Sequence, residues 1–166
     1  DKWSYLCTHV DDILQASNSQ ELVDELKEEL TKEYEQITHH AKADAYIGIS
    51  IEHIKRMEAY HLTQRGLVQR TIDEFLRGDT KSDPADPATD ELLKADHGDQ
   101  TPTDGKKFLS LVMTLMYVAR LTRPDILVAV TVLSTRCSKP TAQDMTHALR
   151  VLRYLRGTID YGILIQ

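Results

Sequence analysis

Residues 2–16 read KWSYLCTHVDDILQA. Trp3, Tyr5 and Cys7 occupy alternate positions, and apolar residues resume after the pair Asp11-Asp12. An alternation with a period of two predicts β-strands, and Asp is common in turns. We therefore expect two strands around a tight turn, with the two aspartates at its tip and Cys7 facing the core.

The adjacent carboxylates of Asp11 and Asp12 suit a divalent cation. Like charges a few ångströms apart repel each other, and a bound cation relieves that repulsion. Carboxylate oxygens are ligands that Mg²⁺ prefers, and a pair of such ions can activate a hydroxyl and stabilise a leaving pyrophosphate. The same dipeptide is also an ordinary turn sequence, so the residues alone leave both interpretations open.

One long helix and a second pair of strands are predicted for the rest of the front half. Residues 20–34 place apolar side chains at helical spacing, and Ser17-x-x-Gln20 is a possible capping box. Residues 46–51 are β-branched and alternating, which predicts a strand with a return strand near residues 59–62. Thr63 is then placed to cap a following helix.

The rear half is predicted to be helical after a long polar stretch. Residues 78–105 are dense in Asp, Pro, Thr and Gly, which predicts a linker or surface loop. An apolar stripe over residues 108–118 predicts one helix, Pro124 begins a second, and residues 145–155 form a third. Residues 161–165 are typical of a short strand.

Length and composition are those of a globular domain. The chain has 166 residues, of which 41% are hydrophobic and 28% charged, and this excludes a wholly disordered chain. Cys7 and Cys137 lie far apart, which argues against a cysteine-built zinc site. The sequence has no run of 18 apolar residues, so no membrane span is predicted. The first residues do not resemble a signal peptide, and we expect them to lie within a larger gene product.

Charge is distributed unevenly along the chain. Residues 1–105 hold 11 Lys and Arg against 23 Asp and Glu, whereas residues 106–156 hold nine against two. An acidic front and a basic rear are compatible with a metal site plus a phosphate-binding surface. They are also compatible with two solvated faces that neutralise each other, which is the simpler interpretation of the charge alone.

The segment THVDDIL at residues 8–14 resembles the YVDDIL motif of reverse transcriptases. The rest of the chain is similar, in order and spacing, to the copia-type LTR retrotransposon reverse transcriptases. Four further segments carry this resemblance: AYIGISI at 45–51, HLTQ at 61–64, LMYVARLTRPDI at 115–126 and RVLRYLRGT at 150–158.

The resemblance implies an α+β fold made of part of a polymerase palm and a helical, thumb-like region. The palm part holds the antiparallel hairpins and a helix. The implied division is a partial palm with the aspartate hairpin and the primer grip at 1–62, the thumb start and an acidic linker at 63–105, a basic helical region at 106–158, and the start of the connection to RNase H at 159–166.

The resemblance also implies roles for individual residues. Asp11 and Asp12 would be catalytic metal ligands for Mg²⁺ or Mn²⁺ in two-metal nucleotidyl transfer by an RNA-directed DNA polymerase. The partners of the intact enzyme would be an RNA template, a DNA primer and dNTP. The residues implied to contact the primer are His9, Val10, Tyr46 and Gly48.

A second implied surface lies in the basic rear, where Arg123, Arg150, Arg153 and Arg156 would bind nucleic acid on helices leading toward RNase H. The open alternative is that these arginines pair with nearby acids while their apolar neighbours pack inward. For an active element the resemblance implies a cytoplasmic, virus-like-particle location.

Parts of the family pattern are missing or altered. The family's other catalytic aspartate and its fingers would precede residue 1, so we expect this chain alone to be inactive. His9 replaces a Tyr, Met113 replaces a Gly in a closely packed helix, and Asp144 replaces a His. The pair His39-His40 stands where the family has other residues; it is either a ligand pair or a solvated loop.

Two function classes therefore remain open. The first is a fragment of a copia-type retrotransposon polyprotein whose intact form polymerises DNA, with upstream palm and fingers and downstream RNase H segments as partners. The second is a non-catalytic, degenerate or domesticated remnant that acts as a nucleic-acid- or protein-binding module.

Overall fold

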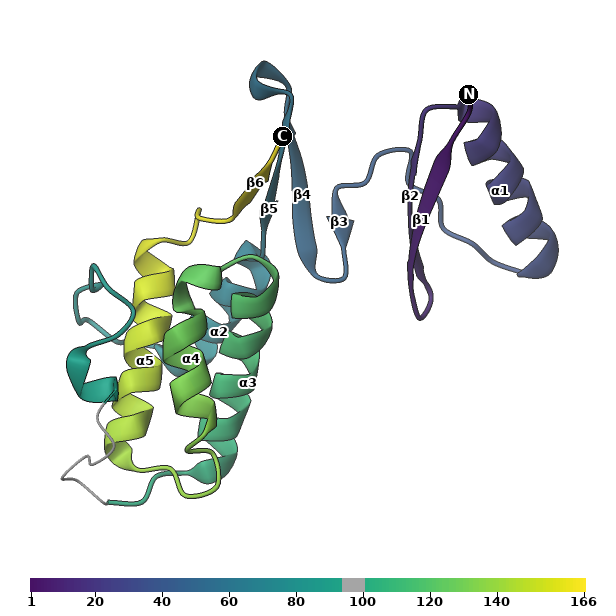
Figure 1. Ribbon diagram of the computed structural model, residues 1–166. Helices are drawn as coiled ribbons and strands as arrows, with labels where there is room; N and C mark the ends of the chain where they lie inside the picture. Colours follow the sequence, from purple (N-terminus) through teal and green to yellow (C-terminus); the bar gives the residue numbers. More distant parts are fainter. Residues whose placement is uncertain (94–100) are drawn as a thin grey trace. The chain divides into compact units, whose positions relative to one another are not determined.

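The computed structural model describes residues 1–93 and 101–166 and shows an α+β protein (Figure 1). It separates into two compact units, Asp1–Ile51 and Glu52–Gln166. The mixed fold class predicted from the sequence is confirmed. The finer division into palm, linker and helical region stays a prediction.

The first unit begins with the expected hairpin. Strand β1 (Ser4–His9) pairs antiparallel with β2 (Asp12–Ser17), and His9 lies opposite Asp12. Helix α1 (Gln20–Glu33) follows and contacts β2. The predicted capping box at Ser17 is wrong, since the N-cap of α1 is Ser19, which makes no side-chain cap hydrogen bond. The Ser17 hydroxyl donates to the Trp3 carbonyl (2.7 Å).

This first unit buries no side chain fully. Tyr5 is 71% exposed and Leu6 51% exposed, although both lie on strand β1. Cys7 is exposed as well, so its expected place in a core is wrong. The hairpin and helix therefore hold together by backbone pairing and polar contacts more than by a hydrophobic core.

The predicted strand at residues 46–51 is interrupted by a turn. Strand β3 (Ala45–Tyr46) pairs antiparallel with β4 (Ile49–Ile54) across Ile47 and Gly48, whose φ angles are 45° and 75°. Two consecutive positive φ angles are the requirement of a type I′ hairpin turn. The single alternating strand is therefore a tight hairpin, which sequence alternation alone could not distinguish.

The second unit contains the remaining strands and most helices. A single 3₁₀ turn, η1 (Lys55–Met57), leads into β5 (Ala59–Thr63), which pairs antiparallel with the short C-terminal strand β6 (Ile163–Ile165). The boundary between the two units falls within β4. The predicted short strand at 161–165 is thus present at its C-terminal end.

Helices α3, α4 and α5 of the second unit run alongside one another (Figure 1), and their buried side chains belong to one hydrophobic core. Leu111, Val130 and Leu152 are fully buried within it and come from three different helices. Met113, in contrast, is 44% exposed, so the expectation that its side chain adds bulk at a closely packed position is wrong. The elements are α2 (Arg65–Phe75), η2 (Asp90–Leu93), α3 (Gly105–Leu121), η3 (Pro124–Ile126), α4 (Leu127–Ser134) and α5 (Ala142–Gly157).

Polar caps set the ends of these helices. The Asp104 carboxylate accepts from two backbone N–H groups at the start of α3. Thr141 and Asp144 form a reciprocal capping box at the start of α5. The expected cap of α2 at Thr63 is wrong, because Thr63 ends β5 and Gln64 takes the N-cap position.

The polar stretch predicted as a linker packs partly onto the helices. Leu92 of η2 is fully buried, and its carbonyl accepts from Arg136 Nη2 (2.7 Å). Residues 94–100 of this stretch lie outside the described residues. Within the described part of the chain, no helix is long and apolar enough to cross a bilayer.

Candidate metal-binding hairpin and the arginines of the helical unit

The tip of the first hairpin is a two-residue turn of Val10 and Asp11. Val10 has a φ of 52° and is 93% exposed. A β-branched residue at positive φ is a genuine outlier and costs on the order of 1–3 kcal/mol. The turn thus holds a strained, exposed residue directly before the two candidate metal ligands.

Asp11 and Asp12 both present exposed carboxylates at this tip. Neither makes a hydrogen bond or an ion pair with any residue that the structure describes. Two free, hard oxygen ligands suit Mg²⁺ or Mn²⁺ chemically, although such ions usually complete their shell with water and substrate phosphate. In residues 1–93 and 101–166, no group of three or more His, Cys, Asp or Glu side chains is arranged to hold a metal ion.

Tyr46 links the second hairpin to this first one. Its hydroxyl donates to the Cys7 carbonyl (3.1 Å) and lies 3.5 Å from Cys7 Sγ. The hydrogen bond with Cys7, followed by desolvation and electrostatic repulsion from the neighbouring Cys7 and Asp12, raises the pKa of Tyr46 to about 12. Tyr46 is therefore protonated at neutral pH and serves as a donor.

The four residues predicted to contact the primer all belong to the first unit. His9 ends β1 beside the aspartates, and Val10 is the exposed turn residue. Tyr46 contacts the middle of β1, and Gly48 forms the positive-φ corner of the β3–β4 turn. Their contact with a primer stays a prediction.

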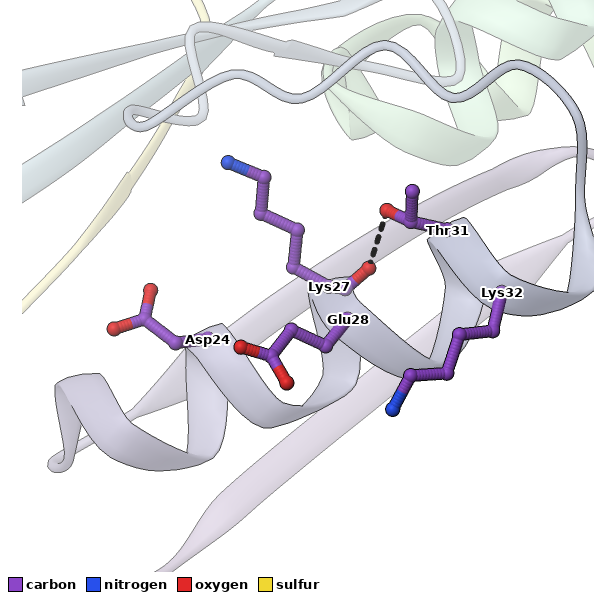
Figure 2. A pocket seen from close by; sticks show the side chains of 5 residues that line it. All are labelled: Asp24, Lys27, Glu28, Thr31 and Lys32. Carbon is purple, nitrogen blue, oxygen red and sulfur yellow. Dashed lines mark hydrogen bonds between the residues drawn. The ribbon is translucent and has the colours of Figure 1, made fainter.

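A shallow concavity of about 520 Å³ lies along α1 (Figure 2), and Asp11 and Asp12 are not among the residues that line it. It is lined by Asp24, Lys27, Glu28, Thr31 and Lys32, and the Thr31 hydroxyl donates to the Lys27 carbonyl (2.7 Å). The lining charges have mixed signs, and α1 has no buried residue. This surface is a solvated helix face of mixed charge.

Arg123 is enclosed at 3% exposure. Its Nε and Nη2 donate to the Asp125 carboxylate at 3.0 and 2.8 Å, and Nη1 and Nη2 donate to the carbonyl and hydroxyl of Thr158 at 2.9 and 2.7 Å. Its guanidinium also lies over the rings of Tyr154 and Tyr161. Arg123 therefore joins the start of η3 to the end of α5.

Arg153 and Arg156 clamp a loop onto α5. Arg153 is 8% exposed, and its Nη1 donates to Asp79 Oδ2 (3.1 Å). Arg156 donates to Asp83 Oδ1 and to the Lys81 carbonyl, both at 2.7 Å. Both side chains thus form the ion pairs that the sequence left open as the alternative to nucleic-acid contact.

Arg150 differs from the other three predicted arginines. It is half-buried, and its Nε is fully buried without a hydrogen-bond acceptor among the described residues. Together with Lys81, Ser82, Asp86 and Arg153, it lines a concavity of about 590 Å³.

Sequence reasoning missed two polar contacts that organise this unit. Thr122 Oγ1 donates to Gln64 Oε1 (2.9 Å), and both residues are buried, so this bond joins the end of α3 to the start of α2. Asp144, noted only as a departure from a pattern, pairs with Arg136 Nη1 (2.8 Å) and is 2% exposed. For Gln64 and Thr122, the available signal was their position inside segments that resemble the family.

The histidine pair at residues 39 and 40 lies on an exposed stretch between α1 and β3. Neither side chain belongs to a metal-binding group within the described residues. Both side chains are exposed, and their role stays a prediction.

Comparison with known proteins finds relatives over nearly the whole chain. A retrovirus-related Pol polyprotein from transposon RE2 of Arabidopsis thaliana is 32% identical over 98% of the chain. A putative transposon Ty5-1 protein of Saccharomyces cerevisiae is 31% identical over 93% of the chain, which spans 49% of that protein. An uncharacterized mitochondrial protein of Arabidopsis thaliana is 30% identical over 98% of the chain, which spans 65% of that protein.

These relatives relate the chain to the Pol region of retrotransposons. The chain spans 11% of the length of the RE2 polyprotein. No protein-family model and no solved structure matches it.

Proposed function

We propose that this chain is part of the reverse-transcriptase region of a copia-type retrotransposon polyprotein. In the intact polyprotein this region takes part in RNA-directed DNA synthesis by two-metal nucleotidyl transfer. The observation that carries the proposal is the exposed pair Asp11-Asp12 at the tip of the first hairpin, within a chain related to Pol polyproteins over 98% of its length.

The hairpin residues have separate tasks in this proposal. Asp11 and Asp12 are the ligands for Mg²⁺ or Mn²⁺, since both carboxylates are exposed and unpaired within the described part of the chain. The chemistry supplied by the ions is activation of the primer 3′-hydroxyl and stabilisation of pyrophosphate. His9 and Val10 lie beneath the primer end, and Tyr46 and Gly48 help to position it.

The helical unit supplies contacts to the backbone of the template–primer. Arg156 and Arg150 keep partly exposed side chains, so direct contact is assigned to them. Arg123 and Arg153 are almost fully buried in ion pairs, and their contribution is to hold the helices and loop that carry the other two.

A Mn²⁺ titration followed by NMR line broadening tests the metal site. Broadening is expected first at residues 10–13, with a dissociation constant on the order of millimolar. Asp11→Asn should weaken this effect, whereas the matched change Asp24→Asn on the α1 concavity should leave it unchanged. Broadening centred on α1 would reject the hairpin as the metal site.

A second candidate is a folded, non-catalytic binding module. The helical unit favours it, because Glu52–Gln166 contains the whole hydrophobic core of the chain's described part. Residues 52–166 expressed alone should then unfold cooperatively and bind an RNA–DNA hybrid. An unfolded product would remove this alternative.

A further inference from the structure

The loop at residues 79–86 and helix α5 enclose a concavity with an unusual balance of charge. It is lined by Lys81, Ser82, Pro84, Ala85, Asp86, Arg150 and Arg153, and all of them belong to the second unit. Its lining holds three basic side chains and one acidic side chain.

Its loop wall is held in place from α5. Asp79 accepts from Arg153 Nη1 (3.1 Å) and from the backbone N–H of Lys81 (2.8 Å). Arg156 donates to Asp83 and to the Lys81 carbonyl. The charges of Arg153 and Arg156 are therefore matched by Asp79 and Asp83, and the loop is fixed before any ligand arrives.

Two cations of the lining are left without such a match. Lys81 has an exposed side chain, and its hydrogen bonds to Asp79 and Arg156 are made by its backbone. Arg150 has no hydrogen bond or ion pair with a described residue, and its buried Nε lacks an acceptor. A buried charged donor without a partner costs stability unless water or an ion satisfies it. Asp86 is the one acid of the lining, and it is exposed.

We propose that this concavity is an oxyanion site that binds a phosphate group. The Arg150 guanidinium supplies a fork of donors, Lys81 a mobile positive charge, and the Ser82 hydroxyl a further donor. The inference deepens the nucleic-acid contacts of the proposed function and rests on them only for the source of the phosphate, which is either a free phosphate or a nucleic-acid backbone.

Inorganic phosphate titrated into the ¹⁵N-labelled chain, at ionic strength matched with NaCl, tests the site. The Arg150 Nε–Hε signal and the backbone amides of residues 81–86 should shift saturably. Arg150→Gln should weaken binding about tenfold, as expected for the loss of hydrogen bonds from a charged group. Asp86→Asn should strengthen binding, because it removes the competing negative charge.

A control variant and a second test variant complete the experiment. Arg120→Gln removes the same charge from an exposed position on α3 and should leave phosphate binding unchanged. Lys81→Gln changes an exposed side chain, so it weakens binding without a folding defect. Linear, unsaturating shifts, equal binding of acetate, or unaltered binding in both Arg150→Gln and Lys81→Gln would overturn the proposal.

A short RNA–DNA hybrid without terminal phosphates distinguishes the two sources. Displacement of inorganic phosphate by the hybrid assigns the site to a nucleic-acid backbone. Retention of phosphate assigns it to a free phosphate group, and both results uphold the site. Failure of the proposed function is read separately, as the loss of Mn²⁺ broadening at the hairpin tip.

Discussion

Arg123 and Thr158, 35 residues apart in the chain, are joined by two hydrogen bonds: Arg123 Nη1 donates to the Thr158 carbonyl and Nη2 to its hydroxyl. Asp125 binds the other edge of the same guanidinium and accepts from the Tyr154 hydroxyl (2.8 Å). The segments TRPDI and RYLRGT thus meet in one closed polar network. This network connects the start of η3 with the end of α5.

Replacing Arg123 should therefore destabilise the helical unit. Arg123→Gln leaves Asp125 and Thr158 without their donors and should lower the free energy of unfolding by about 2–4 kcal/mol. Arg123→Lys keeps the charge but not the fork, so it should recover only part of this loss. Urea unfolding followed by circular dichroism measures the change. Arg120→Gln is the exposed control, and an Arg123→Gln midpoint equal to that of the control would contradict the structural role.

The stability of the same unit should fall in acid through Asp144. Burial alone raises the pKa of Asp144, but hydrogen bonds from Thr141 and Arg136 outweigh it and hold this pKa below its ordinary value of 3.8. A carboxyl with a lowered folded pKa stabilises the fold above its unfolded pKa, and this contribution is lost as pH falls through the folded pKa. The pKa of Asp125 is lowered too, where bonds from Arg123 and Tyr154 outweigh burial.

Unfolding free energies measured between neutral pH and about pH 3 check this dependence. Asp144→Asn should flatten the acid limb and cost stability at neutral pH. Glu74→Gln, on an exposed position of α2, should leave the slope unchanged. An acid limb that is equally steep in Asp144→Asn would refute the assignment.

The sequence predicted most helices because their apolar residues repeat at helical spacing, as in α3 and α5. It could not predict the turn at Ile47 and Gly48, since a β-branched residue at positive φ gives no turn signal. The partner of Arg153 was also out of reach, because Asp79 lies 74 residues away in a stretch that sequence alone indicated only as a linker. Local patterns predict local structure, whereas the arginine ion pairs depend on tertiary packing.

Gly162 should be intolerant of any side chain. A Cβ at this position would lie 2.2 Å from the Leu62 carbonyl oxygen and 2.9 Å from Thr63 Cγ2, so β6 would have to move away from β5. Gly162→Ala should cost about 1–3 kcal/mol of local stability and increase amide hydrogen exchange in β5.

Gly66→Ala is the matched control for Gly162→Ala. Its added Cβ meets only Arg70 Nη1, at 3.7 Å, on helix α2. The change should stabilise the helix by about 0.5–1 kcal/mol. Equal exchange rates in β5 for the two variants would show that β6 tolerates the added methyl group.

The strained turn at Val10 should respond to residues that fit its backbone. Val10→Gly removes the Cβ that disfavours a φ of 52°. This change should stabilise the hairpin by about 1 kcal/mol and so increase its population. Val10→Pro fixes φ near −65° and should abolish the turn. Cross-strand NMR contacts between Cys7 and Leu14, which lie opposite each other, report the hairpin population. A hairpin that survives in Val10→Pro would contradict this backbone geometry.

The 166-residue chain alone should not extend a primer. Its hairpin tip offers two carboxylates, and no third acidic, histidine or cysteine ligand joins them within residues 1–93 and 101–166. Two-metal transfer needs ligands that hold both ions close together, and losing part of that set removes several kcal/mol of barrier lowering, roughly a thousandfold or more in rate. The measurement is extension of oligo(dT) on poly(rA) in Mg²⁺ and Mn²⁺, with Asp11→Asn as the matched background. Extension by the unaltered chain above the level of Asp11→Asn would show that two carboxylates suffice here, and that the metal site is complete within this chain.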